Sequence, residues 1–132
     1  MIATELMDKA DRAAASATLL LDAGDFDGAC NRANYAMFDA ARAALIGCGV
    51  PADQAVAKTH SGLIAAFGLH LVKTGRLPAD LGKALNRASE VRLAADYTGD
   101  MIDADQARRM VEQAGAFIAA IGREQGRPVG KP

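Results

Sequence analysis

Apolar residues recur along this chain every three or four positions, the spacing that places side chains on one face of an α-helix. The pattern separates into five stretches, at about residues 4–23, 25–48, 62–74, 78–97 and 104–125. No stretch alternates apolar and polar residues as a half-buried β-strand does. We therefore predict an all-α fold, an up-and-down helical bundle of four to five helices.

Residues that end and cap helices stand between these stretches. Gly24 and Gly75 follow the first and third stretches, where a glycine commonly ends a helix. Asp25 is placed to cap the second helix, and the spacing of Asp103 and Gln106 is that of a capping box before the fifth. The link at Gly24 is so short that the first two helices are expected to form an antiparallel hairpin.

The second stretch is apolar around most of its circumference between Cys30 and Ile46. A helix of this kind is buried by neighbours on several sides, so we place it at the centre of the bundle. Its polar residues share one arc of about 100° on a helical wheel. They are Asn31, Arg32, Tyr35, Asp39 and Arg42. Such an arc is either a solvated face or, because the other faces are apolar, the place for a site or a dimer contact.

The bulk properties limit what this chain of 132 residues can do. We expect one helical domain at residues 1–125 and a disordered tail at 126–132. A formal net charge of −1 argues against a broad basic face, so no DNA readout is expected. Without a signal peptide or an apolar run near 18 residues, we expect a cytoplasmic protein with no membrane contact. No spacing typical of a metal or cofactor site is present, so neither is predicted.

The fourth stretch carries a charged residue within its apolar stripe. Four apolar residues lie within about 60° of Arg92 on a helical wheel. They are Leu81, Leu85, Ala88 and Ala95. A buried guanidinium needs a partner, and Asp96 follows one helical turn later. One interpretation is structural: Arg92 and Asp96 form an ion pair, or Arg92 lies at the exposed end of the stripe. The other is an arginine presented to a phosphate or a partner subunit, with Tyr97 nearby.

Three blocks of the chain, in this order, resemble the HEPN (higher eukaryotes and prokaryotes nucleotide-binding) domain. They are NRANYAMFDAARAAL at residues 31–45, KTHSGLIAAF at 58–67 and RLAADY at 92–97. The resemblance is strongest to the small stand-alone bacterial proteins of the UPF0332 type. It implies a bundle around two long antiparallel helices, a homodimer, and a role linked to nucleotides or RNA. It also implies a nucleotidyltransferase-type partner, as in some toxin–antitoxin modules.

Numerous HEPN proteins are metal-independent RNases whose signature is an arginine followed, after four to six residues, by a histidine. Arg92 matches that arginine, but Tyr97 stands where the histidine is expected, and no histidine follows within the allowed spacing. Asn34 stands where the family commonly has a second aromatic residue. Because tyrosine has an ordinary pKa near 10, it is a poor general base at neutral pH. We therefore favour binding of nucleotide or RNA over cleavage.

The binding hypothesis assigns a role to each candidate residue. Arg92 engages a phosphate, Asp96 orients the guanidinium, and Tyr97 stacks on the ligand or donates a hydrogen bond to it. Four further candidates for phosphate binding are Arg32, Tyr35, Lys58 and His60. Two alternatives stay open. One is an active RNase toxin with a composite site at the dimer interface, using Arg92 with Tyr97 or His60. The other is a purely structural dimerisation module.

Overall fold

The computed structural model describes residues 2–51, 59–99 and 101–126, with only the backbone given for residues 93 and 95–98. The described residues form five α-helices, a π-helical segment and no strand. The helices are α1 (Ile2–Asp22), α2 (Phe26–Gly47), α4 (His60–Phe67), α5 (Ala79–Thr98) and α6 (Ala104–Glu124), and the π-helical segment is η1 (Gly68–Val72). The prediction of an all-α fold is confirmed.

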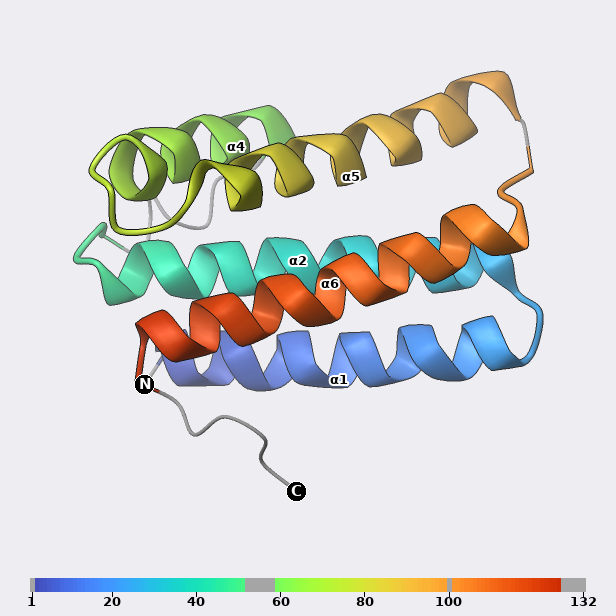
Figure 1. The fold of residues 1–132 in the computed structure, drawn as a ribbon, viewed down its shortest axis with the longest axis horizontal. Coiled ribbons are helices and arrows are strands. Elements are labelled where there is room, and N and C mark those ends of the chain that lie inside the picture. Colours follow the sequence, from blue (N-terminus) through green and yellow to red (C-terminus); the bar gives the residue numbers. More distant parts are fainter. Residues whose placement is uncertain (1, 52–58, 100, 127–132) are drawn as a thin grey trace.

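Figure 1 shows the up-and-down arrangement of these helices. α1 and α2 lie side by side and antiparallel, α6 crosses them obliquely, and α4 and α5 form a layer on the other side of α2. α2 contacts all the other helices and η1. Twelve of its 22 residues are buried, which confirms that it is the central helix of the bundle.

Local sequence signals set several helix boundaries, and those at Gly24, Asp25 and Asp103 lie where the sequence predicted them. Gly24 has a φ of +84° and separates α1 from α2. Asp25, Thr59 and Asp103 cap α2, α4 and α6, each accepting a hydrogen bond of 2.8–3.0 Å from the backbone N–H three residues later. Gln106 completes the capping box of α6. These caps satisfy N–H groups that a helix leaves without partners in its first turn.

The core combines many alanines with a few large side chains. Alanine allows the backbones of α1, α2 and α6 to approach closely, while large residues from all five helices and η1 fill the rest of the core. The largest fully buried apolar side chains are Phe38, Phe67, Phe117, Met7, Met37, Leu45, Leu63, Leu71, Leu85 and Ile121. This packing places the polar arc of α2 opposite the start of α4 and the later turns of α5.

A buried asparagine interrupts the apolar core of α2. Asn34 is 0 % exposed, and neither its Oδ1 nor its Nδ2 has a hydrogen-bond partner within the described part of the chain. Buried polar groups are normally hydrogen-bonded, because removing them from water without compensation costs free energy. Asn34 is therefore a locally unfavourable residue in the helix that organises the fold.

The π-helical segment η1 continues α4 and was not predicted. Its wide turn is closed by a hydrogen bond of 2.8 Å from the Lys73 backbone N–H to the carbonyl of Gly68, five residues earlier. Next to it α5 comes close, since a Cβ added at Gly82 would lie 3.3 Å from Cγ2 of Val72. A π turn leaves little trace in a sequence, because the residues that adopt it also favour an α-helix.

Candidate functional site

Two arginines from different helices share one tyrosine ring at the surface of α2. The Cζ atom of Arg32 lies 5.4 Å from the centroid of the Tyr35 ring, and the Cζ atom of Arg92 lies 5.5 Å from it. Arg32 is one turn before Tyr35 on α2, whereas Arg92 reaches the ring from α5. Both distances are within the range of a cation–π interaction. Since Tyr35 is 41 % exposed, the arrangement is open to solvent.

His60, the first residue of α4, lies next to this arrangement. Its ring is stacked on that of Phe38, with centroids 4.3 Å apart and an interplanar angle of 15°. Burial of the imidazole lowers the pKa of His60 below its ordinary value of 6.5, and the positive charges of Arg92 and Arg42 lower it further. His60 is therefore neutral at pH 7, with one ring nitrogen able to accept a proton and the other able to donate a hydrogen bond.

An ion pair on α2 borders the group formed by Arg32, Tyr35, His60 and Arg92, which we call the arginine–histidine cluster. The guanidinium of Arg42 lies 3.2 Å from the Asp39 carboxylate, one turn earlier on α2. Both side chains are largely covered, at 21 % and 14 % exposed. The pair fixes the position of a positive charge that acts on His60. The cluster therefore lies beside a preorganised charge on α2.

The structure brings together four of the seven residues proposed from the sequence. These are Arg32, Tyr35, His60 and Arg92. Lys58 lies outside the described residues, and for Asp96 and Tyr97 only the backbone, within the last turns of α5, is described. The roles assigned to these three residues stay predictions. Arg92 is partly covered and next to α2, as expected for a charged residue within an apolar stripe.

Phe38 is a site residue that the sequence did not single out. It is 1 % exposed, and its ring covers the core-facing side of the His60 ring. In sequence Phe38 is one more apolar residue of α2, three positions after Tyr35, and the pattern assigns it to the core. Its contact with His60 depends on where α4 begins relative to α2. A helical wheel of α2 alone gives no information on that position.

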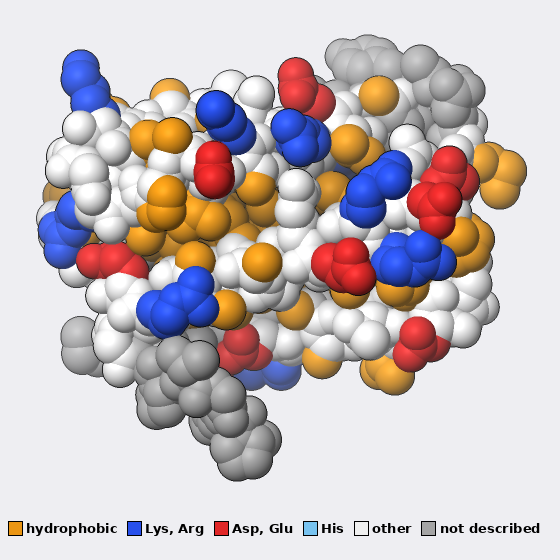
Figure 2. All heavy atoms as spheres, viewed as in Figure 1, with side chains coloured by type: hydrophobic (Ala, Val, Ile, Leu, Met, Phe, Trp, Pro, Cys, Tyr) orange, Lys and Arg blue, Asp and Glu red, His pale blue; other side chains and the backbone are white. Residues whose placement is uncertain are grey.

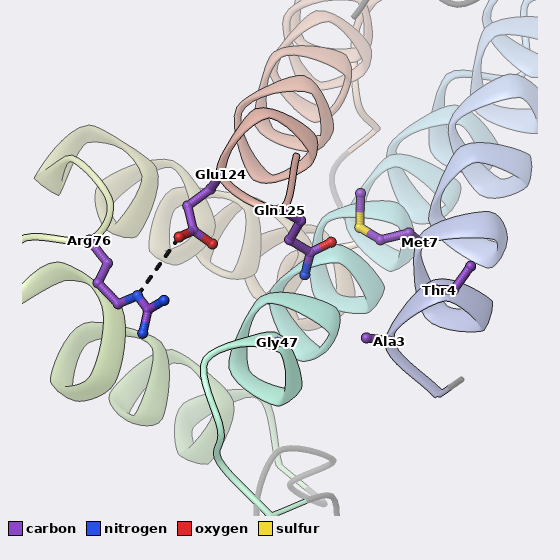
Figure 3. Close-up of a pocket in the computed structure, with 7 residues that line it drawn as sticks. All are labelled: Ala3, Thr4, Met7, Gly47, Arg76, Glu124 and Gln125. Carbon is purple, nitrogen blue, oxygen red and sulfur yellow. Dashed lines mark ion pairs between the residues drawn. The ribbon is translucent and has the colours of Figure 1, made fainter. Parts of the chain in front are cut away.

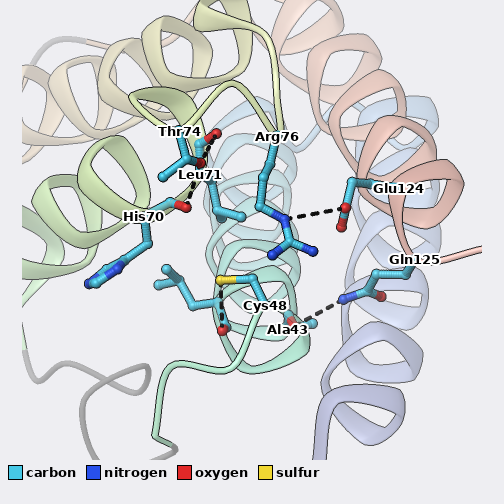
Figure 4. Close-up of polar contacts among 9 residues, drawn as sticks. Ala43, Cys48, His70, Leu71, Thr74, Arg76, Glu124 and Gln125 are labelled. Carbon is cyan, nitrogen blue, oxygen red and sulfur yellow. Dashed lines mark hydrogen bonds and ion pairs between the residues drawn. The ribbon is translucent and has the colours of Figure 1, made fainter.

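A cavity of about 410 Å³ lies away from this cluster, at the end of the bundle where α2 and α6 finish. Figure 3 shows Glu124 and Gln125 of α6 and its cap facing Gly47 of α2, with Arg76 reaching in from the other side. The guanidinium of Arg76 pairs with Glu124 at 3.7 Å. As Figure 4 shows, Nε2 of Gln125 donates a hydrogen bond of 2.9 Å to the carbonyl of Ala43. Because these polar groups pair with one another, we interpret the cavity as a packing feature between the helices and not as a ligand site.

One face of the molecule has the mixed charge that the composition predicts. On the face shown in Figure 2, Lys and Arg side chains alternate with Asp and Glu, and no continuous basic stripe crosses it. Within residues 2–51, 59–99 and 101–126, no group of three or more His, Cys, Asp or Glu side chains is placed to hold a metal ion. None of the described helices is both long enough and apolar enough to span a membrane.

Comparison with known proteins identifies relatives over almost the whole chain. The model of the HEPN domain matches residues 3–125. A UPF0332 protein of Gloeobacter violaceus is 35 % identical over 116 residues, covering 86 % of this chain and 88 % of that protein. A UPF0332 protein of Thermotoga maritima is 35 % identical over 107 residues, covering 80 % and 76 %. A protein of Methanocaldococcus jannaschii whose name designates it a toxin is 28 % identical over 116 residues, covering 88 % and 83 %.

Proposed function

Because the chain belongs to the HEPN domain family, we propose that it binds phosphate groups of a nucleotide or of RNA at the arginine–histidine cluster. The observation that carries this proposal is the pair of guanidinium groups around one ring, Arg32 at 5.4 Å and Arg92 at 5.5 Å from the centroid of Tyr35. Guanidinium groups are the preferred protein ligands of phosphate, because their planar donors match its oxygen atoms.

The charges of the cluster favour an anionic ligand. The two ring distances limit the separation of the Arg32 and Arg92 Cζ atoms to at most 10.9 Å. At that separation two like charges repel by about 1.5 kcal/mol if the effective dielectric constant is about 20. A phosphate bound between them adds an attraction to each guanidinium at a shorter distance, which outweighs this repulsion, and neutral His60 adds a hydrogen-bond donor. Tyr35 is itself exposed and therefore accessible to the same ligand.

Titration of a labelled RNA against purified protein tests the proposal, with fluorescence anisotropy as the readout. We expect Arg92→Ala to weaken binding at least tenfold. Arg109→Ala is the matched control, because Arg109 is an exposed arginine of α6, and binding should change less than twofold. Loss of one phosphate contact also makes the salt dependence of the affinity shallower by about 0.7 in the log–log slope for single-stranded RNA. Absence of binding, or equal binding by Arg92→Ala and wild type, would overturn the proposal.

RNA cleavage is the second candidate function, and His60 is the observation that favours it. A neutral imidazole near Arg92 supplies the base that Tyr97 does not. In this reaction His60 takes the proton of a ribose 2′-hydroxyl, and the 2′-oxygen forms a bond to phosphorus. The bond from phosphorus to the 5′-oxygen breaks, and the leaving oxygen takes a proton from water, whose hydroxide then takes the proton from His60. Arg92 stabilises the charge on the phosphate oxygens. A 2′,3′-cyclic phosphate remains.

Incubation of cellular RNA with the protein in the presence of EDTA separates binding from cleavage. Cleavage by wild type that is absent in both Arg92→Ala and His60→Ala would establish the RNase function. Cleavage that survives in His60→Ala would remove His60 from the reaction. Intact RNA at high protein concentration would leave binding as the function.

The assembly of the protein is part of the same proposal. Two relatives from Methanocaldococcus jannaschii carry names that designate them as toxins. We infer from these names that this chain acts in a toxin–antitoxin module. We further propose, as the resemblance to the HEPN domain implies, that it is a homodimer with a nucleotidyltransferase-type partner. Light scattering of the purified protein should give twice the mass of one chain. Co-expression with the product of the adjacent gene should give a complex that survives size-exclusion chromatography, and a monomer that purifies alone would contradict the assembly.

A further inference from the structure

A hollow of about 560 Å³ lies between α4 and α5, next to the arginine–histidine cluster. Its volume is in the range of small-molecule sites in proteins. Residues of both helices line it: His60, Ser61, Ile64 and Ala65 from α4, and Asn86, Ser89 and Glu90 from α5. The hollow therefore combines an apolar wall with hydroxyl, carboxamide and carboxylate groups, the composition expected of a site that binds a polar, planar molecule.

His60 belongs to both the hollow and the cluster. One face of its ring is covered by Phe38 at a centroid distance of 4.3 Å, so the accessible part of the ring is directed away from Phe38. Because His60 also lines the hollow, a planar group bound there can extend the stack that Phe38 and His60 begin. Proteins commonly bind unpaired nucleobases by stacking them on aromatic or histidine rings.

The arrangement of charges on α5 separates a base from a phosphate. Glu90 and Arg92 are two positions apart, which places them on nearly opposite sides of the helix. The carboxylate of Glu90 is therefore directed away from the region where a phosphate would bind. Ser89 is one turn before Arg92 and lines the hollow, so it lies between the two regions. A nucleotide bound with its phosphate near Arg92 can thus place its base towards Glu90.

Resting on the proposed function, we propose that the hollow between α4 and α5 is a nucleobase site and that Glu90 makes guanine the preferred base. An ionised carboxylate only accepts hydrogen bonds, through two oxygen atoms. On its Watson–Crick edge guanine presents two adjacent donors, N1–H and the N2 amino group, which match these two oxygens. Adenine, cytosine and uracil each present a single donor group on that edge, next to at least one acceptor. The carboxamide of Asn86 can donate to O6 of guanine.

Binding of four labelled RNA tetranucleotides, UUGU, UUAU, UUCU and UUUU, tests this assignment by fluorescence anisotropy. Wild-type protein should bind UUGU at least tenfold more tightly than the other three. In Glu90→Gln one acceptor oxygen is replaced by a donor, so the preference for UUGU should fall below threefold. Glu112→Gln is the matched control, since Glu112 is an exposed glutamate of α6, and it should keep the wild-type preference. Ala65→Phe, which fills the hollow from an exposed position of α4, should weaken binding of UUGU more than that of UUUU.

The outcomes distinguish the base site from the proposed function. Equal affinity of wild type for all four oligonucleotides, with all of them weakened in Arg92→Ala, would overturn the base site and leave phosphate binding intact. A guanine preference unchanged in Glu90→Gln would overturn the role of Glu90. Absence of binding to any of the four by correctly folded wild type, judged by its circular dichroism, would overturn both proposals.

Discussion

Replacement of Asn34 by leucine should stabilise the protein, although it alters the centre of the core. The side chain is 0 % exposed and its polar atoms have no partner within the described residues. A buried polar group without a hydrogen bond costs about 1–3 kcal/mol. Leucine has a similar branched shape and no polar atom, so Asn34→Leu should raise the free energy of unfolding by about this amount. For a chain of 132 residues this corresponds to an increase in Tm of about 4–11 °C.

Thermal and urea unfolding, followed by circular dichroism, measure this difference. Asn31→Leu is the matched control, because Asn31 is an exposed asparagine on the same helix, and it should change the stability by less than about 0.5 kcal/mol. Leucine is slightly larger than asparagine, so Asn34→Ala is needed to separate overpacking from a lost hydrogen bond. If both Asn34→Leu and Asn34→Ala destabilise the protein by more than about 3 kcal/mol, the carboxamide is paired in solution and our reasoning is refuted.

Three further predictions follow from single contacts. A bound phosphodiester favours the protonated form of His60, whose pKa is lowered in the free protein, so binding takes up a proton and affinity for a dinucleoside monophosphate should increase as the pH falls. Titrations should therefore show tighter binding at pH 5.5 than at pH 7.5 in His70→Gln but not in His60→Gln. Gln125→Leu removes the hydrogen bond to the α2 backbone and should lower the free energy of unfolding by about 1 kcal/mol in a urea titration; no change would show that the contact contributes nothing. Burial and, to a smaller extent, Asp27 raise the pKa of Cys30 to about 11. Iodoacetamide at pH 8 should therefore modify the more accessible Cys48 first. Mass spectrometry of the digested protein identifies the modified thiol, and faster labelling of Cys30 would contradict this prediction.

Features that depend on a few neighbouring residues could be predicted from the sequence. Asp25 caps α2 and Asp103 forms a capping box with Gln106, because a cap involves only residues within one helical turn. The central position of α2 could also be predicted, since a helix that is apolar on most sides can be satisfied only by neighbours on most sides. The polar arc of α2 does hold Arg32 and Tyr35, as the wheel indicated.

Contacts between segments far apart in the chain could not be predicted from the sequence pattern. The wheel of α5 indicated that Arg92 needs a partner, but the position of its guanidinium over Tyr35 depends on how α5 packs against α2. The stacking of His60 on Phe38 depends in the same way on the start of α4. Glu90 is exposed, and nothing in the pattern of its own helix distinguishes it from other surface charges. Its proposed role depends on α4, which forms the other wall of the hollow.

The π turn at η1 keeps the buried side chains of α4 and η1 directed at the core over more turns than a regular α-helix allows. Leu63, Phe67 and Leu71 are spaced four residues apart, and all three are 0 % exposed. In an ideal α-helix such a series drifts by about 40° at each step, so the third side chain would rotate out of the core by about 80°. The widened turn at Gly68–Val72 counteracts this drift. Shortening the segment by one residue would therefore change the direction of the chain entering α5, and with it the distance at which Arg92 meets α2.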